Sequence, residues 1–294
     1  GALVYPERTE ACEKIFRQEI RGKPALGQVD FRTLTAQVKE LSDRLISAVD
    51  WGTCSLAGFS ICLCQLTSTL YFIQKVKQKF PELAIVVGGS MFSGASAHDL
   101  LQAFPEIDFA VNGEGERPLS DLIHHLKGCE DRRKIPPIPG LVTRTSAGGK
   151  TPVSFSQMKT LCHLPAPEFD DYFHLLKTFG PDKAFFPTLP AEISRGCWWR
   201  RSQGTVKDAG CAFCNLNLQW TGYRSKDPKQ VVHEIDNLSK KYQTLSVAFT
   251  DNLLPVKSSR EIFERLEKLD KDFRFFGEIR ASTSKPVLEA MRAA

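Results

Sequence analysis

The sequence predicts an α/β fold in which a Rossmann-like, doubly wound parallel sheet is followed by part of a βα barrel. Short apolar segments alternate with amphipathic ones, glycines follow several of the apolar segments, and the alternation resumes after Ala191. Alternation of this kind is typical of parallel sheets covered by helices. We expect a first domain over 1–128, a linker with a small hairpin over 129–190, and a barrel domain over 191–294.

The first domain is expected to hold three strands, each followed by a helix. A further helix precedes them, because Leu34, Val38 and Leu41 recur at helical spacing. Glycines at strand ends allow a ligand to approach the backbone, and parallel sheets bind ligands at their carboxyl ends. The expected elements are strands over 56–63, 84–87 and 108–111, and helices over 30–50, 67–80, 97–104 and 118–126.

The remainder of the chain changes character twice. Prolines and glycines interrupt residues 128–190, where we expect only a hairpin around 140–153. Regular alternation then returns, with Asp227 expected to cap a helix over 228–242. The other expected elements are strands over 192–194, 245–249 and 273–279, and helices over 258–269 and from 285 onward. These are three βα repeats.

Composition excludes several classes of function. The net charge is +5 and the basic residues are scattered, so nucleic-acid binding is not indicated. No apolar run is long enough to cross a bilayer and no signal peptide is visible, so no membrane association is expected. Nine cysteines, an odd number, favour reduced thiols in the cytoplasm over disulfides. The start at Gly1 and the end within a helical pattern suggest a fragment.

The strongest local signal is a group of three cysteines. Cys211 and Cys214 form a C-x-x-C pair, and Cys197 precedes them at the end of an expected strand. A structural zinc site normally has four protein ligands, and His163 or His233 would have to supply the fourth without zinc-finger spacing. Three thiolates suit a [4Fe–4S] cluster with one open iron. Zinc binding and a chance grouping remain alternatives.

Two segments around these cysteines resemble a known family. The runs from Glu192 to Trp199 and from Cys211 to Asn217 are similar to the cluster loop of cobalamin-binding radical SAM proteins, and most similar to the subgroup of peptide (RiPP) maturation C-methyltransferases. The resemblance covers roughly residues 50–294. Further matching motifs lie at 138–141, 164–167, 170–173, 249–252 and 277–282. The gap between Cys197 and Cys211 is longer in this chain than in that family, and the extra residues, around 201–209, are polar. They would form a surface loop that leaves the cluster intact, or they would mark a member with altered activity.

The resemblance implies roles for residues of the expected barrel. Cys197, Cys211 and Cys214 would hold the cluster, whose open iron binds S-adenosylmethionine and cleaves it to a 5′-deoxyadenosyl radical. Further contacts to S-adenosylmethionine would come from Phe213, Asp251, Asn252, Glu278 and Arg280. The alternatives are a hydrophobic anchor for Phe213, an ordinary turn for the Asp-Asn pair, and a buried ion pair for Glu278 and Arg280. Trp198 and Trp199 would shield the cluster or simply pack in the core.

In the first domain the resemblance implies a cobalamin site at the ends of the strands. The implied contacts are Ser60, Gln65, Thr67, Ser68, Gly88, Gly89, Ser90, Gly113, Glu114, Gly115 and Glu116. The loop from Cys62 to Ser68 contains no histidine, so we expect no histidine below the cobalt, where Gln65 or water would lie. The alternative is a Rossmann-like domain without cofactor.

The function implied by the resemblance is cobalamin-dependent methylation of an unactivated carbon by a radical SAM enzyme. The substrate would be a small molecule or a ribosomally made peptide, and the electron donor a flavodoxin or ferredoxin. A first alternative keeps both cofactors but gives rearrangement, oxidation or cyclisation without methyl transfer. A second is a non-catalytic cobalamin- or metal-binding module.

Overall fold

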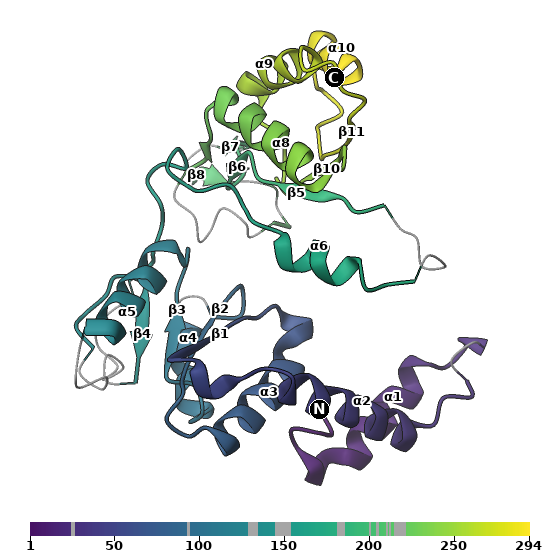
Figure 1. Ribbon diagram of the computed structural model, residues 1–294, viewed down its shortest axis with the longest axis vertical. Coiled ribbons are helices and arrows are strands. Elements are labelled where there is room, and N and C mark those ends of the chain that lie inside the picture. Colours follow the sequence, from purple (N-terminus) through teal and green to yellow (C-terminus); the bar gives the residue numbers. More distant parts are fainter. Residues whose placement is uncertain are drawn as a thin grey trace. The chain divides into compact units, whose positions relative to one another are not determined.

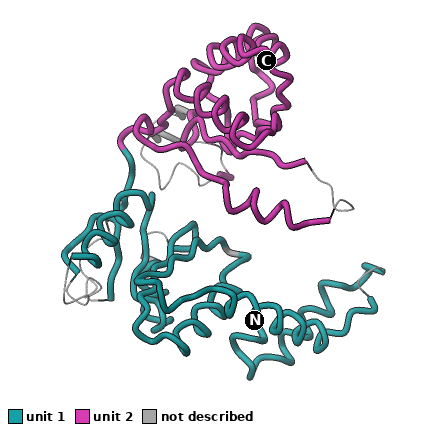
Figure 2. The backbone as a smooth tube through the Cα atoms, in the orientation of Figure 1, with its two compact units in different colours: residues 1–158 teal, residues 159–294 magenta. Residues whose placement is uncertain are grey.

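The computed structural model describes two compact units, Gly1–Met158 and Lys159–Ala294 (Figure 2). The described residues are 1–24, 27–92, 95–128, 135–144, 154–180, 186–199, 201–203, 206–209, 211, 213–214 and 222–294. The boundary between the two units lies within 129–190, the range predicted as a linker, and the predicted domain bounds stay a prediction.

The first unit is built on a four-stranded sheet with the order β1-β2-β3-β4 (Figure 1). β1 (Leu56–Ser60), β2 (Ala84–Gly88) and β3 (Phe109–Val111) are parallel, and β4 (Leu141–Thr143) is antiparallel to β3. The described strands follow one another in chain order, without the reversal that defines a doubly wound sheet. The parallel α/β arrangement is confirmed, and the doubly wound order, which these strands alone do not show, stays a prediction.

Alternate residues of the central strands pack on opposite faces of this sheet. Ile85 and Val87 belong to a core formed with helices α3 and α4, whereas Val86 packs with Leu122 and Leu126 of α5. The period of two follows from the pleat of a strand. Because both faces are covered by helices, β2 and β3 are apolar throughout their length.

The helices of the first unit begin and end close to the predicted positions. Asp30 caps α2 by accepting a hydrogen bond from the backbone N–H of Thr33 at 2.8 Å. The apolar face expected on α2 is only partly packed, since Val38 and Leu41 are 45% and 50% exposed. The helix α1 was not predicted. The helical elements are η1 (Pro6–Arg8), α1 (Thr9–Glu19), α2 (Phe31–Ser47), η3 (Trp51–Thr53), η4 (Leu63–Gln65), α3 (Leu66–Lys79), α4 (Ala95–Ala103) and α5 (Glu116–Gly128).

The hairpin predicted around 140–153 takes a different form where it is described. Its first part is β4, which pairs with β3 of the main sheet. Residues 145–153 lie outside the described residues. The pairing explains the difference, since an apolar strand gains more by joining a preformed sheet than by forming an isolated hairpin.

The second unit contains a parallel sheet with the order β11-β10-β5. Its strands are β5 (Leu189–Ala191), β10 (Ser246–Phe249) and β11 (Arg274–Phe276), joined through helices that pack on the sheet. Asp227 caps α8 as predicted, since its carboxylate accepts a hydrogen bond from the Lys229 backbone N–H at 2.9 Å. The predicted βα repeats are confirmed, but the strand predicted over 192–194 is wrong, because the first strand of the sheet is Leu189–Ala191. These three strands do not show a closed barrel. The helices are α6 (Asp170–Leu176), which was not predicted, α8 (Pro228–Tyr242), α9 (Val256–Glu267) and α10 (Lys285–Ala293).

Two short antiparallel ladders surround the cysteine segment. β6 (Ser194–Arg195) pairs with β9 (Arg224–Ser225), and β7 (Arg201–Gln203) pairs with β8 (Val206–Ala209). The polar insert between Cys197 and Cys211 therefore contains a β-hairpin. None of the described helices combines the length and the apolar character that crossing a membrane requires.

Candidate functional site

The segment between β5 and Cys197 is held in place by a buried carboxylate. Asp251, directly after β10, accepts hydrogen bonds from the Ile193 backbone N–H at 2.9 Å and from the Ser194 hydroxyl. Asp251 is 5% exposed, and Ile193 and Ser194 are buried beside it. Both carboxylate oxygens therefore bind the chain itself. The structure gives Asp251 a role in fixing the loop, which the sequence did not indicate, and contact with S-adenosylmethionine stays a prediction.

Burial is the main influence on the ionisation of Asp251. It raises the pKa of this carboxyl above its ordinary value of 3.8, the charge of Glu192 acts in the same direction, and the hydrogen bonds from Ser194 and Ile193 oppose both. Tyr223 is a neighbour that the sequence analysis missed. Burial raises its pKa to about 12, and the charges of Asp251 and Cys197 add to the effect. Since Tyr223 stands in no recognisable motif, only the folded structure reveals it.

Gly196, which precedes the first cysteine, is required by the geometry of the loop. Its φ is +87°, and a Cβ atom at this position would lie 2.9 Å from the carbonyl oxygen of Gly222. A side chain here would meet both steric exclusion and the strain of the left-handed region. The chain thus turns sharply between β6 and Cys197.

The two tryptophans after Cys197 contact the segments that follow β10 and β11. The Trp198 indole donates a hydrogen bond to the Leu254 carbonyl at 2.9 Å, and the guanidinium carbon of Arg280 lies 3.4 Å from the centre of a Trp199 ring. The Leu254 N–H in turn donates to the Glu278 carbonyl at 2.9 Å. A cavity of about 130 Å³ lies between Trp198, Arg280 and the start of α10. The two tryptophans therefore pack against the segments that follow β10 and β11.

The three cysteines have the donor chemistry of an iron–sulfur site. None of the three forms a disulfide with another described residue, and the Cys214 N–H donates to the Cys211 carbonyl at 3.0 Å in a tight turn. Cys197 and Cys211 are half-buried, while Cys214 is exposed. Within the described residues, however, no three histidine, cysteine, aspartate or glutamate side chains are arranged to hold a metal ion. The thiolate set fits a [4Fe–4S] cluster, and its assembly around one stays a prediction.

The remaining predicted contacts in this unit differ in exposure. Phe213 is 92% exposed, which does not favour its alternative role as a hydrophobic anchor. Asn252 and Glu278 are also exposed, whereas Arg280 is half-buried against Trp199. Glu278 and Arg280 follow β11, which ends at Phe276, so the predicted strand is shorter than expected.

In the first unit, the predicted cobalamin contacts follow the carboxyl ends of three parallel strands. Ser60 ends β1, Ser90 follows β2, and Glu116 follows β3, and all three are exposed. Gln65 is exposed as well, but its side-chain oxygen accepts a hydrogen bond from the Cys62 N–H at 3.0 Å. This edge offers polar groups that suit a large polar cofactor.

The glycines at this edge mostly accommodate the chain itself. A Cβ atom on Gly89 would lie 2.6 Å from the Ile61 carbonyl oxygen, and one on Gly113 would lie 2.3 Å from the Ser156 carbonyl oxygen. Gly88 has only ordinary contacts, and Gly115 faces open space. Close approach of the backbone, which the sequence suggested was for a ligand, is already made at Gly89 and Gly113 by other segments of the chain.

Glu114, another predicted cobalamin contact, is buried in the structure. It is 5% exposed, and its carboxylate accepts a hydrogen bond from the Met158 N–H. The carboxylate therefore fixes the segment at the end of the first unit, and its contact with cobalamin stays a prediction.

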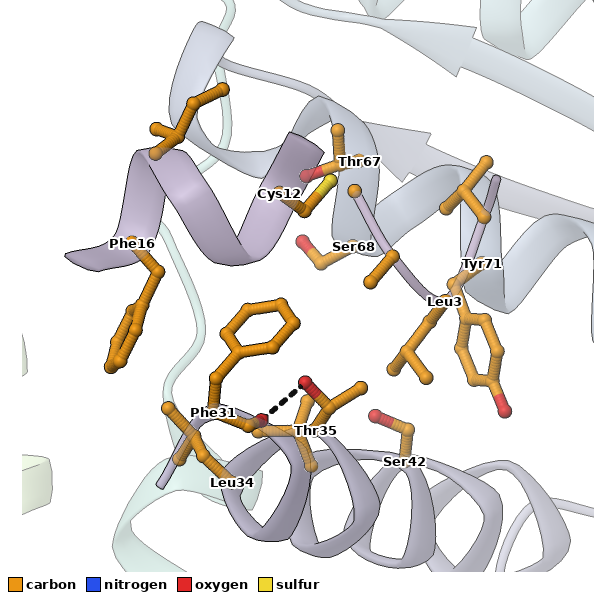
Figure 3. A pocket seen from close by; sticks show the side chains of 15 residues that line it. Leu3, Cys12, Phe16, Phe31, Leu34, Thr35, Ser42, Thr67, Ser68 and Tyr71 are labelled. Atoms are coloured by element: carbon orange, nitrogen blue, oxygen red, sulfur yellow. Dashed lines mark hydrogen bonds between the residues drawn. The ribbon is translucent and has the colours of Figure 1, made fainter. Parts of the chain in front are cut away.

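Thr67 and Ser68 line a separate, mainly apolar cavity of about 440 Å³ (Figure 3). The cavity lies between the amino-terminal segment and α1, α2 and α3. The Thr35 hydroxyl donates to the Phe31 carbonyl at 2.8 Å, and the Ser68 hydroxyl donates to the Gln65 carbonyl at 2.8 Å. The structure thus assigns these two predicted contacts to a helix-lined space.

Two curated proteins are similar in sequence to this chain. Both are anaerobic magnesium-protoporphyrin IX monomethyl ester cyclases. The relative from Synechocystis sp. is 27% identical over 184 residues, which is 59% of this chain and 30% of the relative. The relative from Cereibacter sphaeroides is 25% identical over 179 residues, which is 59% of this chain and 27% of the relative. The chain thus spans less than a third of the length of these relatives.

A solved structure shares the fold over most of the chain. The cobalamin-dependent S-adenosylmethionine radical enzyme OxsB, with aqua-cobalamin bound, matches with a TM-score of 0.58 and 19% identity. The match covers 81% of this chain and 32% of OxsB. No family model matches the sequence.

Proposed function

We propose that this chain supplies the cobalamin-binding and cluster-binding parts of a cobalamin-dependent radical SAM enzyme. The observation that carries the proposal is the loop after β5, where three cysteines outside any disulfide follow a strand of a parallel sheet. The fold shared with OxsB and the distant sequence similarity to the two cyclases support it.

The residues of the second unit would hold the cluster and its substrate. When bound, the cluster and S-adenosylmethionine supply a carbon-centred radical, and cobalamin supplies cobalt chemistry that includes methyl transfer. Cys197, Cys211 and Cys214 would bind iron. Asp251 fixes the backbone of Ile193 and Ser194 on the way to Cys197, so it would orient the loop without touching the iron.

The first unit would bind cobalamin at the exposed edge formed by the ends of β1, β2 and β3. Ser60, Gln65 and Ser90 are exposed there. Gln65 already accepts a hydrogen bond from Cys62, so its amide nitrogen is the part that remains to face a ligand. The loop from Cys62 to Ser68 contains no histidine, so this loop would supply no imidazole to the cofactor.

For the reaction itself, we favour methylation of an unactivated carbon in a small molecule or a ribosomally made peptide. The support is the resemblance of the cysteine loop, and the comparisons do not favour the peptide subgroup. An electron donor such as a flavodoxin or ferredoxin would reduce the cluster. Oxidation or cyclisation without methyl transfer is the second candidate, because both curated relatives are cyclases.

Anaerobic reconstitution tests the proposal. The protein is loaded with iron, sulfide and hydroxocobalamin, its iron and cobalt contents are measured, and 5′-deoxyadenosine is quantified after adding S-adenosylmethionine and a strong reductant. In the wild type we expect iron, cobalt and 5′-deoxyadenosine. In Cys197→Ala we expect iron and 5′-deoxyadenosine to be lost and cobalt to remain. Tight zinc binding without iron would contradict the proposal and favour a non-catalytic metal-binding module.

A labelled methyl group separates the two candidate reactions. S-adenosylmethionine carrying a deuterated methyl group is supplied together with a substrate. Methyl transfer places the label in the product, whereas cyclisation or oxidation leaves the product free of deuterium.

A further inference from the structure

We propose that Arg280 is a positioning residue that holds the cysteine loop by stacking on Trp199. This inference rests on the proposed function in one respect only, namely that the loop carries the cluster. It differs from the role of a direct contact to S-adenosylmethionine, in which the charge of Arg280 would bind a cofactor.

The first observation is the stack itself. The guanidinium carbon of Arg280 lies 3.4 Å from the centre of a Trp199 ring, which is the separation of two surfaces in van der Waals contact. The Nε atom of Arg280 is buried, and no described group hydrogen-bonds to it. A planar guanidinium is well suited to stacking on an indole, both by its shape and by the attraction of a cation to the ring face.

The second observation is an independent link beside the stack. Trp198 donates its indole hydrogen bond to the Leu254 carbonyl, while the Leu254 N–H donates to the Glu278 carbonyl, both at 2.9 Å. The two tryptophan rings meet edge to face at 83°, with centres 6.0 Å apart. The segments that follow β10 and β11 therefore contact Trp198 and Trp199, two neighbouring residues of the loop.

The consequence concerns Cys197, which is followed directly by this tryptophan pair. On its other side the chain is restricted by Gly196, whose backbone turns in the left-handed region against Gly222. A residue fixed on both sides samples few positions. The stack would therefore hold the Cys197 thiol near one position before any iron binds, which lowers the conformational cost of assembling the site.

Alkylation of the metal-free protein tests this without any cofactor. The reduced apoprotein is treated with iodoacetamide, and the rate at each cysteine is followed by peptide mass spectrometry. In Arg280→Gln we expect Cys197 to react about three- to thirtyfold faster, the range that corresponds to the loss of a cation–π contact. Cys54, an exposed thiol of the other unit, serves as the internal reference.

The sign of the effect distinguishes a loosened loop from a simple loss of charge. Loss of a positive charge cannot by itself speed the alkylation of a thiol, because a cation favours the reactive thiolate. A faster rate in Arg280→Gln therefore reports greater mobility or exposure of Cys197. Arg280→Lys, which keeps the charge but not the planar stack, is expected to give an intermediate rate. Arg260→Gln is the matched control, because Arg260 is exposed on α9 and pairs only with Glu264 among described residues.

Two outcomes overturn the inference. One is an unchanged or slower rate at Cys197 in Arg280→Gln with native circular dichroism. The other is an equal acceleration at Cys54, which would mean general unfolding. Failure of the wild type to take up iron would instead remove the proposed function, and the alkylation rates would still decide whether Arg280 positions the loop.

Discussion

At the scale of single residues, Asp251 shows how a polar group at a strand end becomes part of the scaffold. It accepts hydrogen bonds from Ile193 and Ser194, which lie on the neighbouring strand exit, and it is almost fully buried. A buried donor that loses its acceptor keeps its desolvation cost. The carboxylate therefore stabilises the loop more than its two hydrogen bonds alone suggest.

Replacing Asp251 with alanine is expected to lower the free energy of unfolding by about 2–4 kcal/mol, because two buried donors lose their acceptor. Urea unfolding followed by circular dichroism measures the change. Asn252→Ala, at the exposed next residue, is the matched control and should stay within about 0.5 kcal/mol of the wild type. A change in Asp251→Ala no larger than in the control would contradict the scaffold role.

The raised pKa of Asp251 also predicts a pH dependence. The folded state holds this proton more tightly than the unfolded state, so the contribution to stability is complete below pH 3.8 and is lost as pH rises through the raised pKa. Asp251→Asn cannot ionise. We expect the wild type to lose stability relative to Asp251→Asn as the pH rises above 3.8 and through the raised pKa. A constant difference across paired urea titrations would show that burial does not perturb the carboxyl.

At the scale of elements, the loop between β6 and Cys197 depends on a glycine for two separable reasons. Gly196 has both a left-handed φ and a close neighbour, the Gly222 carbonyl, whereas Gly222 has a left-handed φ of +79° and open space around its Cβ position. Substitution of Gly222 therefore tests the backbone strain alone, whereas substitution of Gly196 tests the same strain together with a steric clash.

We expect Gly196→Ala to destabilise the protein by about 2–4 kcal/mol and Gly222→Ala by about 1 kcal/mol, since only the first adds a collision to the backbone strain. Thermal unfolding of both variants under the same conditions measures the difference. Equal melting temperatures would show that the loop shifts to admit the extra methyl group.

The elements also show which features a sequence can predict. The periodicity around α3 and the cap at Asp227 fixed helices to within about two residues. The strand predicted over 273–279 is too long, and α6, which the sequence does not predict, lies in a proline-rich range that indicates a linker. Patterns identify the residues that stand at strand ends. They do not identify the partner of Glu114 or Asp251, because those hydrogen bonds join segments far apart in the chain.

At the scale of the whole molecule, the two predicted cofactor sites belong to different compact units. The exposed edge around Ser60 and Ser90 lies in the first unit, and the three thiols lie in the second. Each unit has its own buried core. Binding of one cofactor should therefore survive the loss of the other.

This independence can be measured with two variants. Replacement of Cys197, Cys211 and Cys214 together by alanine is expected to abolish iron binding and to leave cobalt content unchanged. Ser90→Arg, which adds a bulky charge at the exposed edge, should lower cobalt content at least tenfold and retain iron. Loss of both metals in either variant, measured by elemental analysis, would show that the two sites are coupled.

The hairpin of β7 and β8 shortens the flexible part of the chain between Cys197 and Cys211. Arg201 pairs with Ala209, so the bases of the two strands are neighbours and the insert returns the chain to nearly where it left. The entropy lost in bringing two thiols together depends on the flexible residues between them, and an ordered ladder contributes few. The number of residues between Cys197 and Cys211 therefore overstates the length of flexible chain between them, and shortening the hairpin to a tight turn would keep the spacing of its ends.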